Sequence, residues 1–521
     1  SEDLAVIHEN VTKDLNCILY GGDYNPEQWP KSIWLEDMAY FKKAHINTLT
    51  INVFSWAKLQ PSEDVYDFTE LDEIINLLTE HGFKIILATS TAALPAWMFH
   101  RYPEVGRTDF EGRRHVFGRR HNACPNSSVY QKFAKALVQK LAERYGHHPN
   151  IICWHVNNEY SGACYCDRCK EAFQLWLQNK YGTIDRLNQA WNIAFWGHSL
   201  YAWDEIVPPN LLSEATSERY TAFPAISLDY RRFMSDSLLE NFKMERDLIR
   251  QVNPHTPITT NLMGTSEGLD YFKWAKELDV VSWDNYPGYD TPWSRVAMNH
   301  DLMRGLKQQP FLLMEQTPSQ QNWQPYNSLK RPGQMRAQSY QTLAHGADSI
   351  LFFQMRRSVG ACEKFHGAVI EHAGTDQTRV FREVKALGQE LEQLGTKLLG
   401  AESRNSVGLI FDWDNYWALE YSSGPHKDLW YVDQIYKTYR YFYEQNIGID
   451  MLAFDADFSS YKILLAPVLY MIKPGMKEAL DQFVQAGGIL VTGFMSGIVG
   501  ESDNVYLGGY PGPLRQMSGI W

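Results

Sequence analysis

Short apolar runs alternate with segments of helical periodicity along the first three quarters of the chain. A short run of mostly apolar residues predicts a buried strand, and apolar residues spaced i, i+3, i+4 and i+7 predict an amphipathic helix. Eight strands are predicted in this way, most of them followed by a helix: residues 17–20, 48–54, 84–88, 151–156, 257–262, 279–283, 310–314 and 349–353. Alternating strands and helices imply a parallel sheet, and eight such units close a (β/α)8 TIM barrel. Two long insertions, before the fourth strand and at about 160–228, enlarge it.

The pattern changes near residue 395, where a run rich in glycine and polar residues begins. We therefore place a barrel domain at 1–395 and a smaller, open α/β domain at 396–521. Three further strands are predicted there, at 407–411, 463–466 and 489–492, with helices at 429–443 and 475–486 between them. The turn Ala486-Gly487-Gly488 lacks the spacing of a dinucleotide-binding loop, so we expect no such cofactor.

Composition and charge exclude several classes of protein. With 44% hydrophobic and 21% charged residues, the 521-residue chain is globular and not disordered. The net charge of −12 argues against a nucleic-acid partner, and no apolar stretch is long enough to span a membrane. The first residues, starting at Ser1, do not resemble a signal peptide, and the seven cysteines are an odd number, so we expect a cytoplasmic protein with reduced thiols.

Two glutamates stand where apolar strand runs end. Glu159 follows the fourth strand and Glu315 the seventh, and active sites of parallel barrels lie at these carboxyl ends of the strands. Two facing carboxylates, one protonated and one ionised, are what glycoside hydrolysis requires. Asn158 could hydrogen-bond a sugar hydroxyl, and Arg120, in the loop after the third strand, could supply a positive charge. The alternative is that the strand-end glutamates only form ion pairs.

Aromatic residues support a carbohydrate site, because sugar rings pack on flat aromatic faces. The chain has 17 Trp, 29 Tyr and 25 Phe; most of them must belong to the core, but Tyr286 follows the sixth strand and Trp323 lies in the loop after Glu315. Glu363 and His366 follow the eighth strand and are expected to bind sugar hydroxyls. The alternative for these two is a surface pair.

A cluster of cysteines predicts a metal site apart from the catalytic chemistry. Cys164, Cys166 and Cys169 lie within six residues, and Cys124 in the preceding loop could complete a four-thiolate structural zinc site. Such a closed site holds loops together and leaves no position for catalysis. The alternatives are unligated cysteines or a labile disulfide. The other three cysteines, Cys17, Cys153 and Cys362, are expected in the core.

Several separated motifs resemble one known family, in the right order along the chain. The segment 22–29, Gly-Asp-Tyr-Asn-Pro-Glu-Gln-Trp, resembles the opening motif of glycoside hydrolase family 42, the bacterial β-galactosidases. Asn158-Glu159, Met314-Glu315-Gln316 and the cysteine cluster match the family as well. The resemblance implies a barrel, then a flavodoxin-like domain used for trimerisation, then a small β domain. Because the chain stops at Trp521, we expect a truncated second domain and a homotrimer only if that domain is complete.

The resemblance also implies roles for individual residues and retention of anomeric configuration. Glu159 would be the acid/base and Glu315 the nucleophile. Six residues would bind the galactosyl unit, namely Arg120, Asn158, Tyr286, Trp323, Glu363 and His366. The ligands of a structural Zn²⁺ would be Cys124, Cys164, Cys166 and Cys169.

Three other functions stay open on the sequence alone. The same site could accept α-L-arabinopyranosides, which lack only the hydroxymethyl group of galactose, or other β-glycosides. A non-catalytic sugar-binding barrel would lack one carboxylate, whereas both are present here. A zinc-dependent hydrolase would need an open metal position, which four thiolates do not provide.

Overall fold

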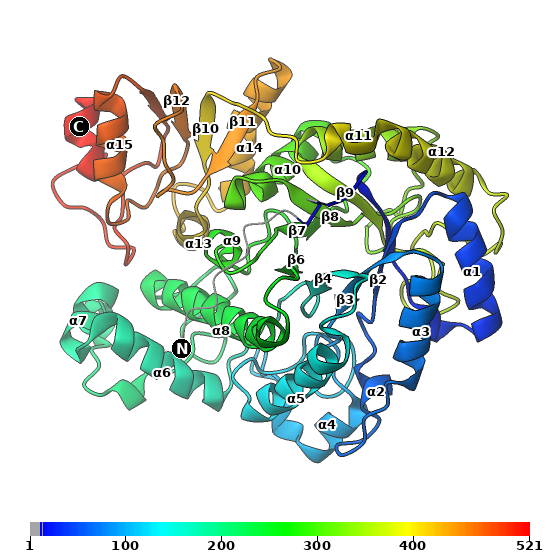
Figure 1. Ribbon diagram of the computed structural model, residues 1–521. Helices are drawn as coiled ribbons and strands as arrows, with labels where there is room; N and C mark the ends of the chain where they lie inside the picture. The colour runs from blue at the N-terminus through cyan, green and yellow to red at the C-terminus, as the bar shows by residue number, and fades with distance from the viewer. Residues whose placement is uncertain (1–10, 13, 521) are drawn as a thin grey trace.

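The computed structural model describes residues 11–12 and 14–520. Its first domain is the expected barrel of parallel strands (Figure 1). The strands are β1 (Leu19–Asp23), β2 (Thr48–Ile51), β3 (Lys84–Ala88), β4 (Ile151–His155), β5 (Ile258–Thr259), β6 (Asn261–Leu262), β7 (Ser282–Asp284), β8 (Phe311–Glu315) and β9 (Ala347–Phe352). They are ordered β5-β4-β3-β2-β1-β9-β8-β7-β6. Since β5 and β6 are halves of one strand interrupted at Thr260, eight strand positions surround the core.

Helices cover the outside of the barrel. They are α1 (Lys31–Lys43), α3 (Thr69–Glu80), α5 (Ser128–Tyr145), α8 (Pro224–Val252), α9 (Tyr271–Ala275), α10 (Trp293–Lys307), α11 (Gln334–Ala344) and α12 (Arg379–Leu394). Four shorter or inserted helices occupy the loops: α2 (Trp56–Leu59), α4 (Ala96–Arg101), α6 (Asp167–Tyr181) and α7 (Ile184–Trp191). In α3 the buried residues Leu71, Ile74, Ile75 and Leu78 form the stripe that the sequence pattern predicts.

Several boundaries differ from the sequence-based expectation, among them those of the first strand and of α8. The first strand was predicted to end at Gly21-Gly22, but both glycines lie inside β1. A Cβ atom on Gly21 would lie 1.7 Å from the carbonyl oxygen of Thr48, and one on Gly22 would lie 2.0 Å from that of Phe352, so close strand packing requires glycine here. Helix α8 begins at Pro224 and so overlaps only the last residues of the region expected to be an insertion.

The second domain is an open sheet of four parallel strands, β11 (Ile449–Leu452), β10 (Val407–Ile410), β12 (Ile463–Ala466) and β13 (Ile489–Thr492), in that order. Its helices are α13 (Trp413–Tyr421), α14 (Tyr431–Glu444), α15 (Met476–Gln485) and α16 (Arg515–Ser518). Strand β11 and helix α13 were not predicted. Strand β13 is an edge strand with most of its side chains exposed, including Ile489 (58%) and Val491 (46%).

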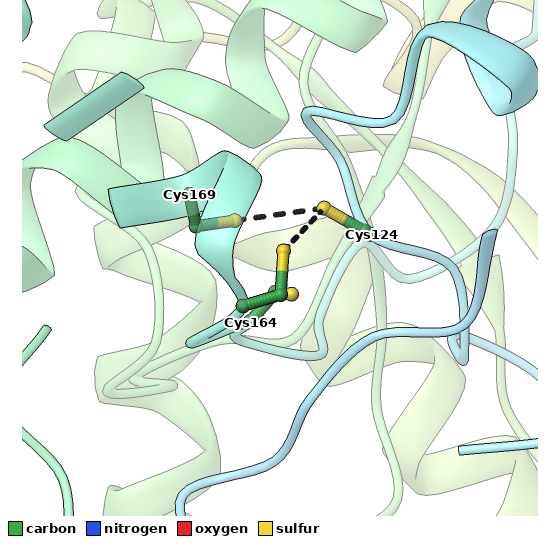
Figure 2. A group of neighbouring side chains, drawn as sticks. Cys124, Cys164 and Cys169 are labelled. Atoms are coloured by element: carbon green, nitrogen blue, oxygen red, sulfur yellow. Dashed lines mark hydrogen bonds between the residues drawn. The ribbon is translucent and has the colours of Figure 1, made fainter. Parts of the chain in front are cut away.

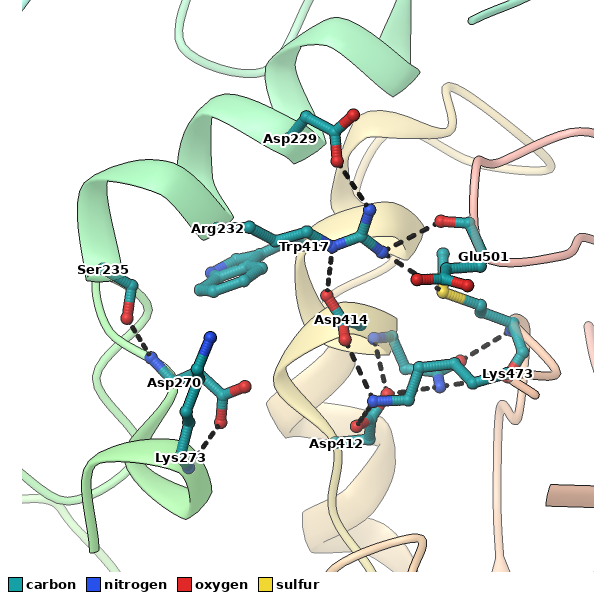
Figure 3. Close-up of polar contacts among 12 residues, drawn as sticks. Asp229, Arg232, Ser235, Asp270, Lys273, Asp412, Asp414, Trp417, Lys473 and Glu501 are labelled. Carbon is teal, nitrogen blue, oxygen red and sulfur yellow. Dashed lines mark hydrogen bonds and ion pairs between the residues drawn. The ribbon is translucent and has the colours of Figure 1, made fainter. Parts of the chain in front are cut away.

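Buried charges join the two domains (Figure 3). Arg232 of α8 donates from Nε to Asp414 of α13 at 2.7 Å. Lys473 donates to Asp412 at 2.7 Å and to Asp414 at 2.9 Å. All four side chains are at most 15% exposed, so this network is a desolvated part of the interface.

Aromatic side chains of α13 form a second part of the interface. The indole of Trp413 donates to the carbonyl of Ser266 at 2.9 Å, and the hydroxyl of Tyr416 donates to that of Thr265 at 3.1 Å. These carbonyls belong to the loop that follows β6, so the second domain holds a loop at the mouth of the barrel. Among the described helices none is long and apolar enough to cross a membrane.

Candidate active site

Three carboxylates converge at the carboxyl ends of the barrel strands. Glu315 is the last residue of β8, Asp284 is the last residue of β7, and Glu159 lies four residues beyond β4. One oxygen from each lies within 4.8 Å of the others. Glu159 and Glu315 therefore meet as expected from the sequence. Asp284 was missed, although it directly follows the apolar run 279–283 and so carried the same strand-end signal.

The amide of Asn261 is the centre of this group. Its Oδ1 accepts the backbone N–H of Glu159 at 2.7 Å. Its Nδ2 donates to Asn158 at 2.9 Å, to Asp284 at 2.6 Å and to Glu315 at 3.2 Å. Asn261 is 1% exposed, so these contacts are shielded from bulk solvent. The sequence did not single it out because it lies within an apolar strand run.

Glu315 is buried and accepts two hydrogen bonds. Its side chain accepts the Tyr286 hydroxyl at 2.7 Å as well as the Asn261 amide. Burial, and then the charge of Glu159, raises the pKa of Glu315 to about 8. Burial, and then the charges of Glu315 and Glu159, raise the pKa of Asp284 well above its usual range. In its protonated form, Asp284 donates a hydrogen bond to Glu315. Hydrogen bonds from Tyr286 and from a protonated Asp284 partly offset the rise in the pKa of Glu315 and so favour its ionised form.

Asp23 adds a fourth buried carboxyl to the site. It is the last residue of β1 and is 2% exposed. Its Oδ1 has no hydrogen-bond partner within the described part of the chain. Burial, followed by the charges of Glu315 and Glu159, raises the pKa of Asp23 well above its usual range. A neutral Asp23 can both donate to and accept from a ligand hydroxyl.

Arg120 and Asn158, which were expected to bind the sugar, both contact Glu159 in the structure. The Arg120 Nη1 lies 3.2 Å from Glu159 Oε1, and the Asn158 Nδ2 donates to the same oxygen at 3.2 Å. The Arg120 guanidinium also lies 5.7 Å from the centre of the Phe54 ring. Glu159 itself has a left-handed backbone, with φ of 47°, which the hydrogen bond to Asn261 supports.

The remaining predicted sugar contacts lie on the loops after β8 and β9. Trp323 is 65% exposed and donates a hydrogen bond to Glu363. Burial raises the pKa of Glu363, and the positive charge of Arg120 opposes that rise. A flat exposed ring beside a carboxyl group suits a sugar with both an apolar face and hydroxyls.

His366 was expected to bind a sugar hydroxyl, but in the structure its ring nitrogens form hydrogen bonds with the backbone. Its Nδ1 accepts the Asn322 N–H at 3.2 Å, and its Nε2 donates to the Phe353 carbonyl at 2.9 Å. Both ring nitrogens are thus used by the backbone, and burial lowers the pKa of His366 to about 4. The ring packs edge-on against Tyr286 at 5.4 Å, so in this structure His366 reaches the site through Tyr286.

The four cysteines of the predicted metal site come together (Figure 2). Cys124 Sγ lies 3.5 Å from the sulfurs of Cys166 and Cys169, and all four sulfurs are within 4.8 Å of one another. A tetrahedral zinc with Zn–S bonds of about 2.3 Å needs sulfurs roughly 3.8 Å apart, so the four thiols fit this ion. The expectation for the other cysteines was wrong in part: Cys153 is buried, but Cys17 is half-buried and Cys362 is exposed.

The barrel and its paired carboxylates define a glycoside hydrolase. The model of the family 42 glycoside hydrolases, described as beta-galactosidase, matches residues 23–394, and that of the beta-galactosidase trimerisation domain matches 405–521. The chain belongs to this β-galactosidase family.

Curated relatives of the chain are also named beta-galactosidases. The chain is 59% identical over 513 residues to beta-galactosidase BgaP of Planococcus sp. (strain L4), covering 98% of this chain and 76% of the relative. It is 52% identical over 510 residues to beta-galactosidase LacZ of Lactobacillus acidophilus, covering 97% and 76%.

Solved structures show the same fold. A beta-galactosidase from Bacillus circulans sp. alkalophilus is 59% identical with a TM-score of 0.96, covering 97% of this chain and 75% of that one. Gan42B, a beta-galactosidase from G. stearothermophilus, is 42% identical with a TM-score of 0.93, covering 98% of this chain and 76% of that one. Gan42B has also been solved as a catalytic mutant in which a glutamate is replaced by alanine.

Proposed function

We propose that the protein hydrolyses terminal β-D-galactosides by double displacement, with Glu315 as the nucleophile and Glu159 as the acid/base. The separation of the two carboxyl groups carries this proposal. Their oxygens lie within 4.8 Å, which suits a retaining enzyme, whose carboxyl groups are about 5–5.5 Å apart, and not an inverting one at about 6.5–9.5 Å.

In the first step, Glu315 attacks the anomeric carbon while Glu159 donates a proton to the leaving oxygen. Asn261, Tyr286 and the protonated Asp284 donate to the Glu315 carboxylate, so the attacking oxygen is oriented and its ionised form is stabilised. The ester that forms has no charge at Glu315. Glu159 has by then given its proton to the leaving group, so its carboxylate, with Arg120 at 3.2 Å, is the base that accepts a proton from the attacking water.

Binding of the galactosyl unit is assigned to side chains around this pair. Trp323 supplies an apolar face, and Arg120, Asn158 and Glu363 supply hydrogen-bonding groups. Tyr286 contacts the nucleophile, and His366 supports Tyr286 from behind. Only the hydroxymethyl group distinguishes galactose from α-L-arabinopyranose. Comparing kcat/KM across a panel of nitrophenyl glycosides measures how strictly the site requires that group.

Two variants test the catalytic assignment. Glu315→Ala should abolish turnover, and added azide should give α-galactosyl azide because attack then comes from the face that Glu315 occupied. Glu159→Ala should keep activity only on activated aryl galactosides, with azide giving the β-azide. Near-normal activity of Glu315→Ala on lactose would overturn the assignment.

The four clustered thiols are proposed to bind a structural Zn²⁺, which would tie the loop after β3 to the loop after β4. Metal analysis of purified protein should give about one zinc per chain. Cys169→Ser should lose the zinc and lower the unfolding temperature, whereas the intact enzyme should keep its kcat when excess chelator is present at room temperature. Loss of kcat without loss of structure would indicate a catalytic metal instead.

Trimer formation through the second domain and a cytoplasmic location are also proposed. The match to a trimerisation domain supports the first, and seven free cysteines support the second. Light scattering of the purified chain tests the oligomeric state.

A further inference from the structure

A buried carboxyl group, that of Glu245, lies behind the loop that carries Glu159. Glu245 is on α8, is 0% exposed, and accepts the Thr91 hydroxyl at 2.9 Å and the Tyr160 hydroxyl at 3.4 Å. No Lys, Arg or His forms an ion pair with Glu245 within residues 11–12 and 14–520. Burial accordingly raises the pKa of Glu245 to about 7. Burying an unpaired carboxyl group destabilises the folded protein. If Glu245 only filled space in the core, an apolar residue would serve as well.

Hydrogen bonds connect this carboxyl group to the proposed acid/base. The Asn157 Nδ2 donates to Thr91 Oγ1 at 3.0 Å, and the Thr91 hydroxyl in turn donates its hydrogen to Glu245 at 2.9 Å. The Asn157 Oδ1 accepts the backbone N–H of Asn158 at 2.8 Å. The Asn158 Nδ2 then donates to Glu159 Oε1 at 3.2 Å. The chain of contacts thus runs from α8 through the ends of β3 and β4 to the site.

The backbone that this chain of contacts supports is strained. Asn157 has φ of 56° and Glu159 has φ of 47°, in the left-handed region that non-glycine residues seldom adopt. The N–H of Asn157 is held by Thr89 at 2.8 Å and that of Glu159 by Asn261 at 2.7 Å. Such a conformation persists only where neighbouring groups hold it in place. The hydroxyls of Thr89 and Thr91, which contact Asn157, are themselves oriented toward Glu245.

We propose that Glu245 is a positioning residue for general acid catalysis: as an acceptor for Thr91, it sets the orientation of the Asn157 amide and thereby the position of Glu159. This rests on the proposed role of Glu159. It predicts a specific defect, because general acid help matters most when the leaving group is a poor one. The sugar leaving group of lactose needs the proton from Glu159. The dinitrophenolate of 2,4-dinitrophenyl β-galactoside departs without protonation.

The test is the dependence of kcat/KM on the leaving group in Glu245→Gln. This variant keeps the size of the side chain but replaces one of its two acceptor oxygens with a donor. We expect kcat/KM for lactose to fall at least about tenfold and kcat/KM for the dinitrophenyl galactoside to change less than about twofold, within the range by which general acids act. Equal losses on both substrates, or no loss on lactose, would overturn the proposal.

Two further comparisons keep the result unambiguous. Glu240→Gln, an exposed change on the same helix, serves as the control and should leave both substrates unaffected. If Glu245→Gln does not fold, Thr91→Val should show the same leaving-group dependence, and Thr91→Ser, which keeps the hydroxyl, should restore the rate on lactose. Glu159→Ala is measured in parallel, because a failure of that variant to show leaving-group dependence would contradict the function of Glu159 itself.

Discussion

The amide of Asn261 contacts both proposed catalytic glutamates, and its removal should therefore affect chemistry more than binding. Asn261→Ala removes the acceptor of the Glu159 N–H and one of the donors to the Glu315 carboxylate. We expect kcat to fall by about 100-fold, since small displacements of reacting groups have effects of that order, with a smaller change in KM. Steady-state kinetics on nitrophenyl galactoside check this, with circular dichroism to confirm folding. A kcat within twofold of the unmodified enzyme would contradict it.

Glu315 should make the folded protein less stable as the pH rises. Its pKa is about 8 in the folded protein, against an ordinary value of 4.5, so the folded state holds this proton more tightly. Its stabilising contribution is complete below pH 4.5 and is lost as the pH rises toward 8, by about 1.4 kcal/mol per unit of pKa difference. Glu315→Gln should therefore unfold at a higher temperature than the native chain at pH 8, with a smaller difference at pH 5. A difference that is the same at both pH values would contradict this.

The site residues differ in how well the sequence alone predicts them. Glu159 and Glu315 could be predicted because each follows an apolar run in a chain already recognised as a barrel. Asn261 and Glu245 could not, because a polar residue inside a strand run or a helix reads as an ordinary surface position until the fold places it against the site. His366 was found, but only the structure shows that its two nitrogens are used by the backbone.

At the scale of elements, the pairing of α8 with α13 depends on Asp414. Asp414→Asn removes the negative charge between Arg232 and Lys473, leaving two nearly buried cations without full compensation. We expect a destabilisation of about 3–5 kcal/mol, as for the loss of one partner of a buried ion pair. The exposed pair of Arg440 and Glu444 provides the control, because Glu444→Gln should cost less than about 1 kcal/mol. Denaturant unfolding of both variants measures the difference, and equal midpoints would contradict it.

Short apolar runs predicted some elements accurately. Strands β3, β12 and β13 have the predicted bounds, although β13 is mostly exposed. Strand β11 was missed because Asp450, which pairs with Arg304, interrupts its short apolar run. Helix α13 was missed because it buries aromatic and polar residues around most of its surface, so it has no clear apolar stripe.

For the whole molecule, the junction of the two domains depends on a close approach of α10 to β11. A Cβ atom on Gly305 would lie 2.1 Å from the carbonyl oxygen of Met451. Gly305→Ala should push the domains apart, so that calorimetry shows a separate unfolding transition for the second domain at a lower temperature. Gly493→Ala, where a Cβ would meet nothing within 4 Å, should leave a single transition. One unchanged transition in Gly305→Ala would show that the interface tolerates the shift.

The exposed edge of the second domain has a consequence for handling the protein. Within the described residues no strand pairs with the outer side of β13, which presents free backbone groups beside Ile489 and Val491. An open apolar edge is a template on which another extended segment can add, and this makes it a starting point for ordered aggregation. Val491→Lys should slow the growth of thioflavin-binding aggregates in concentrated samples, while barrel substitutions such as Glu240→Gln should not. The stability of the barrel and the shelf life of the protein would then be governed by different parts of the chain.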